Sequence, residues 1–162
     1  MNVFDNIRKD DVHAVCESSR LKATLIGGIY DVKCHKAMDN GTIIAIGTHV
    51  EGQLFNSKDY AAGEKAYLVL TAPLAYNGKK WQSAEKYFYN AEGEIARAYE
   101  LYVDDIFTLS AEAFTGSPAV GKFVDASFAA GAEAGSTGFV GEIIEEVAYT
   151  NSKSYRVRVI KL

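Results

Sequence analysis

The chain has 162 residues, of which 48% are hydrophobic and 23% charged, and its formal net charge is -4. This length and composition are typical of a soluble globular protein that buries a core without disulfides. The acidic balance and the lack of Lys or Arg runs argue against nucleic-acid binding, and no stretch of about 18 apolar residues predicts a membrane helix. We therefore expect neither nucleic acid nor membrane as a partner.

Residues 1–21 mix charged and scattered apolar side chains without a helical or strand period, and they predict an N-terminal arm. Val3, Phe4 and Ile7 are its candidate partner-binding residues, because they can share one face of a short turn that becomes ordered only on docking. No apolar secretory segment is present, so we expect synthesis in a cytoplasm. Cys16 and Cys34 are then expected to stay reduced.

Residues 22–162 predict one all-β or β-rich domain, a small β-barrel or sandwich with at most a short helix. Its glycine, aromatic and β-branched content favours strands joined by tight turns. A strand, a bend at Gly27-Gly28 and a second strand are expected over 22–34. Asp39-Asn40-Gly41 predicts a hairpin that leads into a strand at 42–47. Residues 55–63 read as polar and turn-rich, and 64–72 as a strand closed by Pro73.

The stretch 93–110 has the longest strand-like alternation in the chain and predicts the middle of a sheet. Ile95, Tyr99, Leu101 and Val103 fall on one face, which we expect to be the core face. Arg97 interrupts that face and is a further candidate partner-binding residue. A buried guanidinium needs a carboxylate, from the Asp104-Asp105 corner or the acidic strand 142–146, within the fold or across a subunit boundary.

The C-terminal third predicts one helical turn at 111–114, a short strand at 120–124 and a flexible Gly/Ala-rich loop near 126–138. The end reads as a β-hairpin, with strands at 139–150 and 154–162 joined at 151–153. In the second strand, one face holds the apolar side chains Tyr155, Val157 and Val159. The other face holds Arg156 and Arg158.

Few residues suggest chemistry. Two pairs, His13 with Cys16 and Cys34 with His35, form the only cluster of metal-type ligands, but neighbouring residues in a strand point to opposite faces and the usual zinc spacing is missing. His49 lies outside any nucleophile motif, and Asp104, Asp105, Glu142, Glu145 and Glu146 lack a calcium-loop order. No phosphate-binding glycine loop occurs. We therefore predict no catalytic, cofactor or metal residues and no enzyme.

Four segments together resemble the small capsid-coating proteins of tailed bacteriophages. They are DNGTIIAIG at 39–47, GEKAYLVLTAP at 63–73, YNAEGEIARAYELYVDDIFTLSAEAF at 89–114 and AVGKFV at 119–124. This is similar to a plan in which an Asn-Gly turn and strands led by Gly-Glu and Val-Gly build a small β-rich body behind an arm. The chain is longer than the smallest decoration proteins, and its Gly/Ala-rich region and final hairpin are extra.

The resemblance implies a non-enzymatic virion structural protein, a capsid decoration or auxiliary protein that binds and stabilises the assembled shell. Its partners would be the major capsid protein or other virion proteins, and it would form a homo-oligomer, with a trimer favoured. Its location would be the virion, assembled in the host cytoplasm. Two alternatives stay open: a small ligand-binding barrel or hydrolase, and a tail or other virion component.

Overall fold

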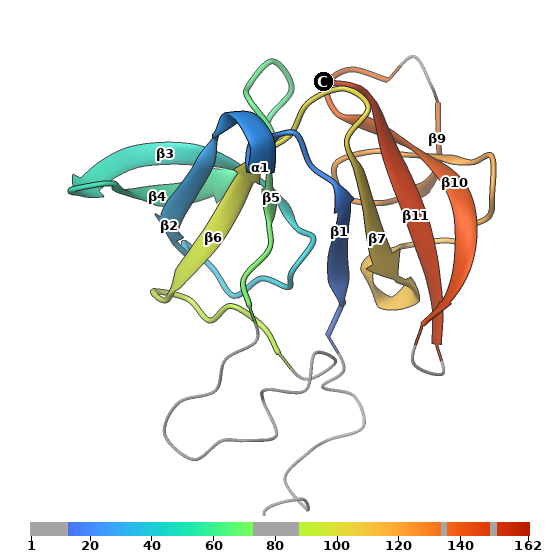
Figure 1. Ribbon diagram of the computed structural model, residues 1–162, viewed down its shortest axis with the longest axis horizontal. Helices are drawn as coiled ribbons and strands as arrows, with labels where there is room; N and C mark the ends of the chain where they lie inside the picture. The colour runs from blue at the N-terminus through green and yellow to red at the C-terminus, as the bar shows by residue number, and fades with distance from the viewer. Residues whose placement is uncertain (1–12, 73–87, 134–135, 150–151) are drawn as a thin grey trace, which may run out of the picture.

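The computed structural model describes residues 13–72, 88–133, 136–149 and 152–162. Within them the chain forms a closed five-stranded barrel and a six-stranded sheet, here called sheet A, which lie side by side (Figure 1). In the described ranges the helical content is one four-residue α-helix, α1 (Ala23–Ile26), and one turn of 3-10 helix, η4 (Ala111–Ala113). The predicted β-rich class, with a barrel and at most a short helix, is confirmed.

The barrel is formed by strands in the order β2-β4-β3-β5-β6. β2 and β4 run parallel, and the other neighbours are antiparallel. Closure leaves the barrel without a free strand edge. The strands are β2 (Ile29–Lys33), β3 (Ile43–Glu51), β4 (Leu54–Asp59), β5 (Tyr67–Val69) and β6 (Ile95–Glu100).

Side chains fill the barrel interior. This core is small and rich in alanine and valine, because five strands enclose little space. Its buried members are Val32, Cys34, Met38, Ile44, Tyr67, Val69, Ala96 and Ala98.

Sheet A is antiparallel throughout, with the order β1-β7-β11-β10-β8-β9. Its longest strands form the predicted C-terminal hairpin, which is confirmed, although β11 begins at Ser152, two residues earlier than expected. The two residues between those strands lie outside the described ranges. The strands are β1 (Cys16–Arg20), β7 (Ile106–Ser110), β8 (Phe123–Val124), β9 (Ala130–Ala132), β10 (Val140–Tyr149) and β11 (Ser152–Lys161).

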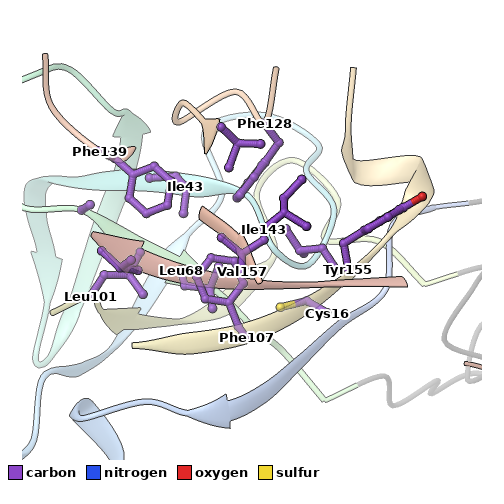
Figure 2. Packing of buried hydrophobic residues seen from close by; sticks show 14 of the residues in the cluster. Cys16, Ile43, Leu68, Leu101, Phe107, Phe128, Phe139, Ile143, Tyr155 and Val157 are labelled. Atoms are coloured by element: carbon purple, nitrogen blue, oxygen red, sulfur yellow. The ribbon is translucent and has the colours of Figure 1, made fainter. Parts of the chain in front are cut away.

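A second, larger core joins the barrel to sheet A (Figure 2). Ile43 and Leu68 come from the outer face of the barrel, and Phe107 and Val157 come from sheet A. Phe128 meets the rings of Phe107, Phe114 and Phe139 edge to face, with centroids 5.9 to 6.2 Å apart. The barrel and sheet A therefore share one apolar interior.

The Asn40-Gly41 turn forms as predicted, but it does not make a hairpin. β3 pairs with β4 and β5, while β2 pairs with β4 and β6, so the strands on either side of the turn are not neighbours. Gly41 instead has a φ of +94° and lies against the Leu109 side chain of sheet A. The turn brings the barrel close to sheet A.

Four other local predictions are wrong. Residues 16–20, expected in the arm, form β1, because their edge pairs with β7 about 90 residues later. The expected strand before Gly27 is helix α1, and the turn-rich 55–63 region contains β4. The Gly/Ala-rich segment contributes β9, and Phe128 within it is buried in the larger core.

The core face of β6 is also the reverse of the prediction. Ala96 and Ala98 point into the barrel, whereas Ile95 and Arg97 are exposed. Large side chains cannot enter the narrow interior at this strand, so its alanines face inward. Leu101 is buried as expected, but it lies in the larger core after β6 has ended.

Candidate interaction surface

Three large apolar side chains project into solvent beside one hollow. Leu25 is 85% exposed and Ile26 60%, both from α1, and Val103 from the turn before β7 is 52% exposed. We call these three residues the α1 patch. Leu25 and Val103 are also walls of a hollow of about 240 Å³, whose other lining residues are Arg20, Leu21, Lys22, Asp104 and Asp105.

Local bonds fix α1 and its direction. The N–H of Ile26 donates to the Lys22 carbonyl at 3.1 Å, and that of Gly27 donates to the Ala23 carbonyl at 3.0 Å. Ala23 is the buried residue of this single turn, so the following side chains point outward. Gly28, with a φ of +105°, then passes so close to β6 that an added Cβ would lie 2.9 Å from the Glu100 carboxylate.

The buried carboxylate of Asp105 connects α1 to the turn that carries Val103. It accepts hydrogen bonds from the backbone N–H groups of Lys22 at 2.9 Å and Tyr102 at 2.8 Å. Burial raises the pKa of Asp105 above its ordinary value, although the two N–H groups oppose that shift. The two backbone segments that carry the α1 patch are thus held together by hydrogen bonds to Asp105.

The same turn is also tied to the end of β11. The N–H of Asp104 donates to the Val159 carbonyl at 2.7 Å, and the N–H of Val159 donates to the Asp105 carbonyl at 2.8 Å. Asp104 takes a φ of +75°, a left-handed conformation that non-glycine residues seldom adopt. Its side chain is consequently held at the rim of the hollow.

Exposed charges of both signs surround the hollow. Arg20 and Lys22 come just before α1 in the chain, and Asp104 follows Val103. Lys22 Nζ is 5.6 Å from the centroid of the Tyr102 ring. Among the described residues, none of these three charges forms an ion pair within the chain. The rim is therefore mixed in charge, and its charges are unpaired within the described part of the chain.

A Ser-His-Asp group that the sequence analysis missed lies beside β4. Ser57 Oγ is 2.6 Å from His35 Nδ1, and His35 Nε2 is 3.0 Å from an oxygen of Asp59. These residue types are those of a hydrolytic triad. Ser57 and Asp59 are two residues apart in β4, so they lie on the same face of the strand. This spacing is the sequence signal that could have indicated the group.

The contacts of this group are structural. Ser57 is only 4% exposed, and its hydroxyl also accepts the backbone N–H of His35 at 3.0 Å. The Asp59 carboxylate contacts Lys36 as well, and that hydrogen bond is the main reason why its pKa is lowered. A nucleophile must reach its substrate, and this hydroxyl is enclosed and already bonded. The group fastens the segment after β2 to β4.

The residues considered for a metal lie apart. His13 Nδ1 is 2.6 Å from the Asp39 carboxylate, and its ring stacks on Tyr89 with centroids 4.7 Å apart. Cys16 is buried in the larger core and Cys34 in the barrel core, and burial raises the pKa of both thiols, that of Cys34 to about 11. No group of three potential metal ligands occurs within the described ranges.

The remaining predicted site residues do not meet at one place. Val3, Phe4 and Ile7 lie outside the described residues. Arg97 is exposed on β6 opposite Asp31 of β2.

The glutamates of strand 142–146, proposed as partners of Arg97, are engaged elsewhere. Glu142 and Glu145 pair with Arg158 and Arg156 across the outer face of the β10–β11 hairpin. Glu146 pairs with Lys153 in the same hairpin. His49, considered in the sequence analysis as a lone catalytic candidate, bonds the Gly52 carbonyl at the β3–β4 turn. The expectation that Arg97 is buried among core residues is wrong, because its face of the strand points outward.

Comparisons with protein-family models, with curated proteins and with solved structures found no match. None of the helices in the described part of the chain has the length and apolarity needed to cross a membrane.

Proposed function

We propose that this chain is a non-enzymatic structural protein of a tailed-bacteriophage virion, of the capsid decoration or auxiliary type. It binds other virion proteins, foremost the major capsid protein, through surfaces on a rigid β-rich body. The sequence resemblance given above supports the virion role. A tail or other virion component is the second candidate of the same chemical kind.

The observation that carries a binding role is the α1 patch. Leu25, Ile26 and Val103 are exposed together, and they stand on structure held by the buried Asp105. Exposed apolar side chains around a hollow mark protein contact surfaces, since their hydration is unfavourable unless a partner covers them. Because hydrogen bonds fix α1 and the 102–105 turn, the three side chains of the patch are held in exposed positions.

The Ser-His-Asp group supplies the strongest argument for the alternative hydrolase, and its geometry disfavours that function. The hydroxyl of Ser57 is buried and accepts a backbone N–H, so a substrate carbonyl has no approach to it. The filled barrel core likewise disfavours a small-molecule binder. Both arguments favour a protein that binds its partners through its outer surface.

The proposal is tested by co-sedimentation. Shells are assembled from the major capsid protein of a candidate phage, purified without this chain, and mixed with the purified chain. We expect saturable binding at a fixed number of copies per shell and a higher melting temperature of the decorated shell. Binding that never saturates, or shells with unchanged melting and no bound chain, would contradict a capsid role.

A further inference from the structure

We propose that a second copy of this chain docks on the α1 patch in a reciprocal, two-fold contact. This inference rests on the proposed role in virion assembly and names the partner of the surface that carries it. Leu25 of each copy enters the hollow of the other, and Val103 of each copy lies against the partner's α1. The contact is formed by the same residues on both sides.

Shape supports this arrangement. Leu25 projects from the wall of the hollow that it helps to line, so the projection and the hollow belong to one face. When the projection and the hollow lie on one face, a two-fold axis lets the projection of each copy fill the hollow of the other. A ring of three needs the projection and the hollow on different faces. The resemblance favours a trimer, whereas this placement favours a dimer.

Charge supports a second copy over other protein partners. Arg20, Lys22 and Asp104 all line the hollow, and none of the three is ion-paired among the described residues. Because the lining carries both signs, a second copy brings a complement to each, and in the two-fold contact that we propose Lys22 of each copy faces Asp104 of the other. A uniformly charged partner would instead meet one repulsive group at this rim.

The size of the patch sets the strength that we expect. A stable complex buries about 800 Å² of each partner, and three exposed apolar side chains supply only part of that area. The contact is consequently weak, with a dissociation constant on the order of micromolar. It would act together with attachment to a shell, which raises the local concentration of the chain.

The first test is sedimentation velocity of the purified full chain from about 1 to 200 µM, a range that brackets the expected constant. We expect a monomer–dimer equilibrium that Leu25→Glu or Val103→Glu weakens at least about tenfold, because each places a charge in the apolar contact. Val120→Glu is the matched control, since Val120 is 58% exposed but does not line the hollow, and its substitution should leave the equilibrium unchanged. Melting temperatures show that each variant is folded.

The second test uses charge reversal in separate proteins. Lys22→Glu alone and Asp104→Lys alone should each dimerise less than the wild type, because like charges then face each other at both pairs. An equimolar mixture of the two variants should recover a dimer, since both pairs across the mixed contact are complementary. A mixture that stays monomeric while the wild type dimerises would overturn the reciprocal contact.

Other outcomes separate this inference from the proposed function. A monomer at all concentrations, a trimer, or a dimer insensitive to Leu25→Glu overturns the two-fold contact. If the monomeric chain still binds shells and Leu25→Glu abolishes that binding, a shell protein occupies the α1 patch and the virion role stands. If the chain dimerises as expected yet does not bind shells, the dimer stands and the capsid role fails.

Discussion

The carboxylate of Asp105 accepts the backbone N–H of Lys22, 83 residues earlier in the chain, at 2.9 Å. Its other oxygen accepts the N–H of Tyr102 at 2.8 Å. One buried side chain therefore holds both segments that carry the α1 patch. The position of Leu25 relative to Val103 depends on these two bonds as well as on apolar packing.

Replacing Asp105 with Ala should lower the free energy of unfolding by about 2 to 3 kcal/mol, because two partly buried N–H donors lose a charged acceptor. Denaturant unfolding at pH 7 measures this loss. Asp31→Ala is the control, since Asp31 is exposed on β2 and its removal should change stability by less than about 0.5 kcal/mol. Equal effects of the two substitutions would show that the Asp105 bonds carry no net stability.

The contribution of Asp105 should also depend on pH. Its pKa is raised in the folded chain, chiefly by burial, so the folded state binds the proton more tightly than the unfolded state. Stability from this group is therefore fully present below the unfolded pKa of about 4 and declines as pH rises through the folded pKa. The stability difference between the wild type and Asp105→Ala should be larger at pH 3.5 than at pH 7, by about the free energy of the pKa shift. A smaller difference at low pH would reverse the assigned direction.

Gly41→Ala should destabilise the protein by more than its backbone angle alone requires. An added Cβ at Gly41 would overlap the Leu109 side chain, in addition to the strain of a φ of +94°. Gly63 is the matched control, because its φ of +91° is nearly the same while nothing lies within 4 Å of an added Cβ. We expect a loss of about 1 to 2 kcal/mol for Gly63→Ala and at least about 2 kcal/mol more for Gly41→Ala. Similar losses in calorimetry would mean that Leu109 yields easily.

Ser57→Ala should cost stability without removing an activity. The hydroxyl bonds both the ring and the backbone N–H of His35, so its loss should lower the free energy of unfolding by about 1 to 2 kcal/mol. The wild type should release p-nitrophenol from p-nitrophenyl acetate no faster than a Ser57→Ala sample or an equal concentration of free imidazole. A burst of product that only the wild type gives would establish a nucleophilic serine and contradict the non-enzymatic role.

Local patterns in the sequence predicted the parts of the fold that local chemistry decides. The alternation around Tyr155, Val157 and Val159 predicts a strand with one buried face, and these residues are buried in β11. The Asn40-Gly41 dipeptide predicts a turn because glycine accepts the positive φ found there. Which strands become neighbours is decided by distant partners. β1 pairs with β7 through Cys16 and Leu109, and nothing in the local pattern indicates that pairing.

The candidate surface was hidden from the sequence for the same reason. Leu25 and Ile26 read as the end of a strand, since two apolar segments flank the Gly27-Gly28 bend. Their exposure follows from a single helical turn that buries only Ala23 and from the fixed position of the 102–105 turn beside it. A surface built from segments about 80 residues apart has no sequence period that could indicate it.

Arg97→Met should leave both stability and oligomeric state nearly unchanged. The side chain of Arg97 is exposed on β6, and its cross-strand position opposite Asp31 contributes at most about 0.5 to 1 kcal/mol. Ala98→Met is the matched control, because it places the same side chain one residue later on the filled inner face of the same strand. Overpacking there should cost at least about 2 kcal/mol in denaturant unfolding. If Arg97→Met instead abolished the dimer in sedimentation velocity while leaving the fold intact, Arg97 would belong to a subunit contact, as its sequence position first suggested.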